Sequence, residues 1–159
     1  PIFEGSRVFL FEIQSLLGTP NFGMPRRTVE GYDRNRVEIL SAVLSRSLNV
    51  DVNSKDIYIN IPGGIELNDR SSDLAVVFSL LSSVNKIPIS QKISAIGELG
   101  LRGEVRKVSF IKNRITELEK LGFTGVYLPK SHEADLKKEK IKLKLNYISN
   151  ISELIERVK

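Results

Sequence analysis

The sequence of 159 residues contains no cysteine and a single histidine, His132. Without cysteine the chain can form neither a disulfide nor a thiolate metal site, and one histidine argues against a zinc site. His132 lies in a polar stretch, which predicts a surface position. No apolar run approaches the length that crosses a membrane, and the first residues lack the charged-then-apolar layout of a signal peptide. We therefore expect a cytoplasmic chain without a membrane partner or a bound metal.

The composition is that of one folded domain, with 41% hydrophobic and 27% charged residues. No repeat, low-complexity segment or linker divides the chain, so residues 1–159 are expected to form a single domain. The net charge of +5 at pH 7 permits a nucleic-acid partner without requiring one. The chain begins at Pro1, without a methionine and within strand-like sequence, so we expect a fragment of a longer protein.

The stretch from Pro62 to Ser83 combines a glycine turn with an apolar run of helical spacing. Four apolar residues recur at i, i+3, i+4 and i+7, namely Leu74, Val77, Phe78 and Leu81. Ser72 is therefore expected at the N-terminal end of a buried helix, where unpaired N–H groups and the helix dipole create positive potential. Such a place suits a nucleophile or a bound anion, but the commoner use of serine there is to cap the helix.

The remaining patterns alternate between strand and helix. Strand patterns cover residues 8–16, 56–61, 92–99, 105–108, 125–128 and 141–148, and helical patterns cover residues 35–48, 110–121 and 150–158. Asp33 and Ser109 are candidate caps of the first two of these helices, Asn150 and Glu153 form a candidate capping box for the third, and Leu121 is expected to face inward. The order predicts an α/β domain in two layers, with a mixed sheet because residues 97–108 read as a hairpin.

The sequence leaves four classes of function to compare. A nucleotide-binding enzyme is the least supported, because the glycines at 97–103 lack the Gly-Lys-Ser/Thr of a P-loop and the order of a dinucleotide fingerprint. The other three classes are a nucleic-acid-binding domain, a Ser-Lys hydrolase and a non-catalytic interaction or assembly domain.

Two groups of basic residues favour nucleic acid. The residues assigned to DNA contact are Arg26, Arg27, Arg34, Arg36, Arg102, Arg106 and Lys107, and the second group continues to Lys112 and Arg114. Clustered basic side chains neutralise phosphates and release counterions. The alternative for each group is a solvated face or a set of intramolecular ion pairs.

Ser72 and Lys112 are the candidates for a hydrolase. A serine needs a base to become a nucleophile, and a desolvated, neutral lysine can supply one. Both residues are expected near the starts of helices, so the fold could bring them together. Any chain with serines and lysines offers such pairs, however, so this signal has little specificity.

Several stretches together resemble one protein family. They are FEIQSL, PRRTVEGYDRNRVEILSAVL, DIYINIPGGIEL, SSDLAVVFSLLSS, IGELGLRGEVRKV and the LGF that precedes VYLP. In this order they cover nearly the whole chain and resemble the C-terminal domain of the RadA/Sms family, which are bacterial RecA-like DNA repair ATPases. That domain is similar to the proteolytic domain of Lon protease and has the α/β fold called ribosomal protein S5 domain 2-like.

The resemblance implies a role in DNA repair and recombination, in processing recombination intermediates and in branch migration. It implies DNA and further copies of the same protein as partners, in a hexameric ring, and no small-molecule substrate for this domain. In the family, a zinc finger and an ATPase core precede the domain. The resemblance therefore assigns ATP, magnesium and zinc to parts of the parent protein that this sequence lacks, and no cofactor to this domain.

The resemblance also bears on Ser72 and Lys112. Active Lon domains carry the serine in D-G-P-S-A-G and the lysine in G-G-x-K-E-K, and these positions align with Ser72 and Lys112. RadA-type domains usually have a small residue such as alanine at the serine position, so Ser72 departs toward Lon. Asp73 and Leu74 differ from Lon, which has small residues at these two positions. The carboxylate of Asp73 would also place negative charge beside a developing oxyanion, which is the wrong sign for stabilising it. We interpret the pair as vestigial or coincidental, with an active Ser-Lys peptidase as the alternative.

Overall fold

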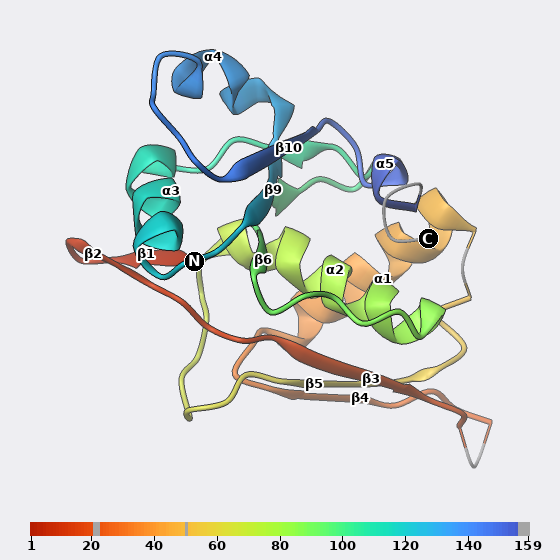
Figure 1. Ribbon diagram of the computed structural model, residues 1–159. Coiled ribbons are helices and arrows are strands. Elements are labelled where there is room, and N and C mark those ends of the chain that lie inside the picture. The colour runs from red at the N-terminus through yellow and green to blue at the C-terminus, as the bar shows by residue number, and fades with distance from the viewer. Residues whose placement is uncertain (21–22, 50, 156–159) are drawn as a thin grey trace.

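The computed structural model describes residues 1–20, 23–49 and 51–155 (Figure 1). The strands are β1 (Ile2–Glu4), β2 (Arg7–Phe9), β3 (Gln14–Gly18), β4 (Arg27–Glu30), β5 (Asp56–Asn60), β6 (Ile93–Ala95), β7 (Glu98–Leu99), β8 (Val105–Arg106), β9 (Gly125–Pro129) and β10 (Lys144–Ile148). The helices are α1 (Arg34–Leu48), α2 (Asp73–Asn85), α3 (Ile111–Lys120), α4 (Glu133–Leu136) and α5 (Ser152–Ile155). No helix within these residues is long and apolar enough to cross a membrane.

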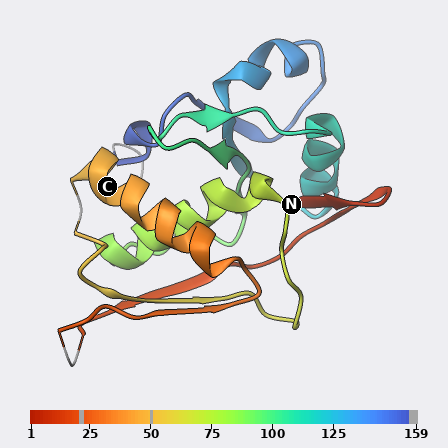
Figure 2. The same ribbon diagram turned by 180° about the vertical axis from the view of Figure 1, so that it is seen from behind.

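Helices α1 and α2 lie between two three-stranded sheets (Figures 1 and 2). The lower sheet has the order β3-β5-β4 and is mixed, because β5 pairs antiparallel with β3 and parallel with β4. The upper sheet has the order β10-β9-β6 and is parallel. Helix α2, which the apolar run at residues 74–81 predicts, contacts both β3 and β6. It therefore lies in the middle of the core. The chain is thus of the mixed α/β class.

Helix α1 begins and ends where the sequence predicts. The carboxylate of Asp33 accepts hydrogen bonds from the backbone N–H of Asn35 and Arg36, which confirms its capping role. The helix ends at Leu48, and Asn49 follows in the left-handed conformation that commonly terminates helices. Its buried side chains include Val37, Leu40 and Leu44, as their spacing indicates.

Two predicted strands are each divided. The strand expected at residues 8–16 is β2 and β3, because residues 10–13 leave the ladder while Phe11 and Ile13 still pack on the core. The strand expected at residues 92–99 is β6 and β7. Between them the N–H of Ile96 donates to Tyr127 O over 2.9 Å, and the N–H of Gly97 donates to Ser71 O over 2.8 Å. The backbone changes partners at this point, and the ladder is broken.

The predicted hairpin at residues 97–108 is present as β7 and β8, paired antiparallel. It forms a two-stranded sheet of its own, so the mixed sheet of the fold is the one around β5 rather than one that contains the hairpin. β10 is an edge strand of the upper sheet, as its alternating pattern predicts.

Helix α3 differs from the prediction at both ends. Ser109 does not cap it; Phe110 occupies the cap position in the left-handed conformation and makes no capping side-chain bond. The helix ends at Lys120, so Leu121 lies beyond the last helical residue and is 50% exposed rather than inward. Gly122 follows with φ +74°, and its N–H donates to Glu119 O, as expected of a terminating glycine.

The C-terminal capping box is confirmed. The side chain of Asn150 accepts from the N–H of Ser152, and Glu153 accepts from the N–H of Asn150. The structure describes α5 as far as Ile155, and the predicted end of this helix at 158 lies outside the described residues.

His132 is buried, with 3% of its surface exposed, so the predicted surface position is wrong. Its Nε2 accepts from the N–H of Val108 over 3.0 Å, and its Nδ1 lies 2.8 Å from Asp135 Oδ2. The polar neighbours of His132 in the sequence conceal this position, because one of its two partners, the N–H of Val108, is distant in sequence.

Candidate functional site

Ser72 is the last residue of a short 3₁₀ helix, Arg70–Ser72, and directly precedes α2. Its hydroxyl donates a hydrogen bond to Asp69 O over 2.6 Å and lies 3.4 Å from Tyr32 Oη. It makes no capping bond to α2. The hydroxyl proton is therefore directed to a backbone carbonyl, which neither activates the oxygen nor caps the helix.

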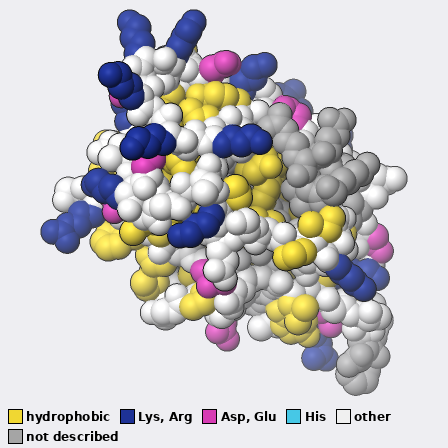
Figure 3. Space-filling model, viewed as in Figure 1, with side chains coloured by type: hydrophobic (Ala, Val, Ile, Leu, Met, Phe, Trp, Pro, Cys, Tyr) yellow, Lys and Arg dark blue, Asp and Glu magenta, His cyan; other side chains and the backbone are white. Residues whose placement is uncertain are grey.

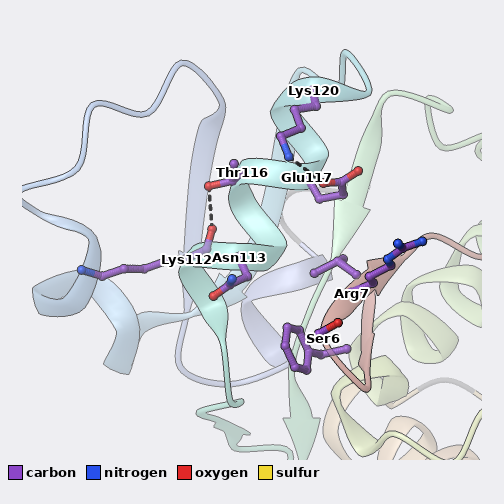
Figure 4. Close-up of a pocket in the computed structure, with 9 residues that line it drawn as sticks. Ser6, Arg7, Lys112, Asn113, Thr116, Glu117 and Lys120 are labelled. Atoms are coloured by element: carbon purple, nitrogen blue, oxygen red, sulfur yellow. Dashed lines mark hydrogen bonds and ion pairs between the residues drawn. The ribbon is translucent and has the colours of Figure 1, made fainter.

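Lys112 lies in the first turn of α3 and is exposed over 59% of its side chain. Its Nζ is 2.6 Å from Glu139 Oε1, and this hydrogen bond raises the pKa of Lys112. In Figure 4 the side chain extends from α3 away from Arg7. A general base must be neutral, and Glu139 favours the charged ammonium. Among the described residues no hydrogen bond joins Lys112 to Ser72, and each has a different partner.

Arg114 is the basic residue of α3 that reaches the turn before α2. Its guanidinium donates to Ser71 Oγ over 2.6 Å and to Asp69 Oδ2 over 2.8 Å, and the side chain is almost completely buried. Burial alone would raise the pKa of Asp69, but the hydrogen bonds from Arg114 and Ser71 hold it below its ordinary value.

The sequence contains a signal for the burial of Arg114 that its charge obscures. Arg114 belongs to the same apolar repeat as three buried residues of α3, Ile111, Ile115 and Leu118.

Asp73 also has a role that the sequence does not indicate. Its side chain is fully buried and is paired with the guanidinium of Arg36, with Arg36 Nε 3.0 Å from Oδ1 and a second, shorter bond to Oδ2. The same carboxylate accepts from Tyr32 Oη over 2.7 Å and from the N–H of Leu99 over 3.0 Å. Burial, together with the negative charge of Asp73, raises the pKa of Tyr32. Asp73 therefore joins α1, α2 and β7 in the core.

This pairing engages the guanidinium of Arg36, one of the residues predicted to contact DNA. Its side chain is only 13% exposed, and its guanidinium also donates to Leu99 O over 2.7 Å. A DNA phosphate contacts side chains at the surface, whereas Arg36 is used to neutralise a carboxylate inside the fold. The hydrogen bond to Asp73 raises the pKa of Arg36 further, so the side chain stays charged.

The rest of the first basic group lies around β4 and the start of α1. Arg27 donates to two backbone carbonyls of the loop before β5, Lys55 O and Asn53 O, and so supports that loop. Arg34 is exposed and lies 3.7 Å from Glu38 one turn along α1. Arg26 is exposed, and its backbone N–H donates to Asp56 Oδ1.

The second basic group lies on the β7–β8 hairpin and just after it. Arg106 is paired with Glu104 over 2.7 Å, Lys107 is paired with Asp135 over 2.9 Å, and Arg102 is exposed in the turn. The hairpin and β4 lie on opposite sides of the layer formed by α1 and α2 (Figures 1 and 2). Arg26 and Arg27 therefore lie on the far side of the helices from the second group, whereas Arg36 of α1 reaches Leu99 O in β7.

Two surface depressions flank these residues. One lies between the β1–β2 hairpin and α3 and is lined by polar and basic side chains that include Arg7, Lys112 and Lys120 (Figure 4). The other runs along α2 and is lined by Ser72, Phe78 and residues of the segments 10–13 and 89–95. In the part of the chain that the structure describes, no three or more His, Asp or Glu side chains gather as a metal site would require.

Comparisons with known proteins give similarities over most of the chain. Residues 37–158 match the model of the Lon protease (S16) C-terminal proteolytic domain. The chain is 44% identical over 128 residues to the DNA repair protein RadA of Streptococcus pyogenes, and 43% identical over 126 residues to that of Bacillus subtilis. It is 39% identical over 127 residues to the RadA of Helicobacter pylori. These matches cover 79–80% of this chain but only 28% of each relative.

Proposed function

Since this chain belongs to the family of Lon protease (S16) C-terminal proteolytic domains, as the Lon-like domain of the RadA/Sms type, we propose that it is a non-proteolytic domain for assembly and DNA contact. In this proposal it serves a cytoplasmic DNA repair ATPase that processes recombination intermediates and promotes branch migration. The same proposal gives the domain the α/β fold called ribosomal protein S5 domain 2-like. Helix α2 contacts a sheet on each side, so the arrangement has one layer more than the two that the sequence predicts. ATP, magnesium and zinc bind elsewhere in the parent protein.

The proposal that the domain is non-proteolytic rests on one observation, which is that Ser72 and Lys112 each bond a different partner. Ser72 donates its proton to Asp69 O, while Lys112 pairs with Glu139 and is held in its charged form. A Ser-Lys mechanism requires the serine hydroxyl to bond a neutral amine. Arg114, which does reach the adjacent Ser71, cannot deprotonate a hydroxyl because a guanidinium stays protonated in proteins.

DNA contact is supported by the relatives, whose name is DNA repair protein, and by basic residues that remain at the surface. Arg36 and Arg27 already bind groups of the fold. We therefore give most weight to the other five predicted residues, which are Arg26, Arg34, Arg102, Arg106 and Lys107. Their ion pairs lie at the surface, where such pairs contribute little and can be exchanged for a phosphate.

Proteolysis is tested by incubating the chain with unfolded casein, in parallel with Ser72→Ala. We expect no cleavage by either protein. Cleavage by the unmodified chain that is lost in Ser72→Ala would contradict the scaffold role and identify a Ser-Lys peptidase.

Self-association is tested by light scattering, since a ring needs an interface that repeats head to tail and closes. A chain that stays monomeric at millimolar concentration would contradict the assembly role.

DNA contact is tested by measuring affinity at several salt concentrations. We expect the combined substitution Arg102→Gln and Arg106→Gln to weaken binding and to lower the salt slope by about 0.9 for each DNA phosphate that the protein no longer neutralises. The matched control is Arg46→Gln with Lys86→Gln, which removes two exposed charges from outside the predicted groups. Equal effects of the two pairs would mean that the hairpin arginines act only through net charge.

A further inference from the structure

Phe110 is an exposed aromatic residue in a strained backbone conformation. It has φ +58° and ψ +36°, a region that bulky side chains rarely adopt, and 56% of its surface is exposed. Its ring stacks on Phe3 with the centroids 4.0 Å apart and an angle of 16° between the planes. The β1–β2 hairpin thus supports one side of an aromatic ring that also faces solvent.

Two basic grooves adjoin this aromatic pair. Phe3 lines the groove of Figure 4 together with Arg7, Lys112 and Lys120. Phe110 lines a second groove together with Lys107 and Lys112. Lys112 and Asn113 line both grooves, so the grooves meet at the first turn of α3. The stacked rings therefore have positively charged side chains on both sides.

The positive charges can be redirected toward a ligand. Lys107, Lys112 and Lys120 pair with Asp135, Glu139 and Glu117, but all three lysine side chains are more than half exposed. Exposed ion pairs are weak, so a phosphate can compete with the carboxylates. The side chain of Arg7 has no hydrogen-bond or ion-pair partner among the described residues.

A lysine-rich segment extends this basic surface. Glu119 of α3 accepts hydrogen bonds from the backbone N–H of Lys142 and Leu143, which holds the segment at residues 137–143 beside α3. Lys138, Lys140 and Lys142 are exposed, and no ion pair to them occurs within the described part of the chain. Figure 3 shows the molecule from the side of Figure 1, and Lys and Arg side chains gather over the upper part of the visible face, with few acidic side chains among them.

We propose that Phe110 is a stacking platform for a base of single-stranded nucleic acid, with Arg7, Lys107 and Lys112 contacting the phosphates on either side. Aromatic rings flanked by basic grooves are the usual means of binding single strands, because every base has a face that can stack. In a duplex the bases are already stacked and paired, so the ring is selective for single strands. The inference deepens the proposed DNA contact and rests on it.

The first experiment compares the chain with Phe110→Asn. Asparagine tolerates the left-handed conformation, so the fold is retained while the ring is lost. We expect the affinity for a fluorescent oligothymidylate to fall roughly 5- to 150-fold, the effect of losing one stacked base, with duplex affinity unchanged. Leu121→Asn is the control, because it removes an exposed apolar side chain just after the other end of α3 and leaves both affinities unchanged.

A second variant reports stacking directly. The sequence contains no tryptophan, so Phe110→Trp introduces a single indole whose fluorescence a stacked base quenches. Quenching by oligothymidylate supports the platform, and unchanged fluorescence at saturation overturns it.

The outcomes separate this inference from the function on which it rests. Full single-strand affinity in Phe110→Asn overturns the platform while DNA contact stands. A parent chain that binds neither single-stranded nor duplex DNA overturns both. Loss of self-association in Phe110→Asn, with DNA affinity retained, identifies the ring as part of an interface between copies and also overturns the platform.

Discussion

Arg114 donates a hydrogen bond to the hydroxyl of Ser71 over 2.6 Å, and both side chains are buried. Helix α3 therefore brings a permanent cation to the serine next to Ser72, and a guanidinium cannot lose its charge as the base of a Ser-Lys enzyme must. The same guanidinium binds Asp69, so it holds together the turn, α3 and the backbone carbonyl of Ser109. The arrangement stabilises the fold and performs no chemistry on the serine.

Arg114→Met should be among the most destabilising substitutions in the chain. It leaves Asp69 without its cation and Ser71 without its donor, and breaking a buried pair in this way costs about 3–5 kcal/mol. Chemical denaturation measures the loss. Lys112→Met is the control, because its ion pair is exposed, and it should leave the free energy of unfolding unchanged. A larger loss for Lys112→Met would mean that Lys112 has a structural partner other than Glu139.

Asp69 should make stability depend on pH in the acid range. Its pKa is lower in the folded chain than the unfolded value of about 3.9, so its contribution is present above that value and is lost as the pH falls through the folded pKa. The difference in stability between the chain and Asp69→Asn should therefore be constant near neutral pH and disappear as the pH falls through the folded pKa of Asp69. A difference that persists in acid would assign the effect to packing instead of charge.

Arg36 and Arg34 offer a matched comparison two residues apart. Arg36→Met leaves the buried Asp73 uncompensated and should cost about 3–5 kcal/mol, whereas Arg34→Met removes one exposed pair and should cost at most about 0.5 kcal/mol. DNA affinity measured on the folded fraction should be unchanged in Arg36→Met. If affinity falls at constant stability, the guanidinium reaches DNA and its assignment to the core is wrong.

His132→Ala tests the buried imidazole. The N–H of Val108, which is part-buried, would lose its acceptor, so the cost should not exceed the penalty of about 1–3 kcal/mol for an unsatisfied buried donor. Lys130→Ala, an exposed change in the same short helix, serves as the control. Thermal unfolding of the two variants gives the comparison, and equal melting temperatures would show that water replaces the imidazole at no cost.

Local pattern predicts much of this fold. The apolar repeat of α2, the Asp33 cap of α1, the hairpin at residues 97–108 and the C-terminal capping box depend on neighbours within a few residues. For these elements, sequence spacing determines which side chains face the core. Strand ends are harder to predict, because the division between β6 and β7 depends on the distant acceptors Tyr127 O and Ser71 O.

The candidate site is much less predictable. Arg36 bonds Asp73, which is 37 positions away in the sequence, and Arg114 bonds Ser71, which is 43 positions away. No local pattern reveals either pair. The sequence places both arginines among surface charges, because charged residues are rarely buried without a partner. It also places Phe110 inside the helix over residues 110–121. Phe110 instead precedes the helix in a left-handed conformation that the sequence gives no reason to expect.

The lower sheet has a consequence for the order in which the chain folds. Strand β5 pairs with β3 across about 40 residues and with β4 across about 30, whereas the β1–β2 and β7–β8 hairpins close over a few. Long loops lose entropy before any contact compensates for it, so the hairpins and helices can form before either three-stranded sheet, whose distant pairings also include β6 with β9. During synthesis, β3 and β4 therefore remain without their common partner until β5 has emerged and folded between them.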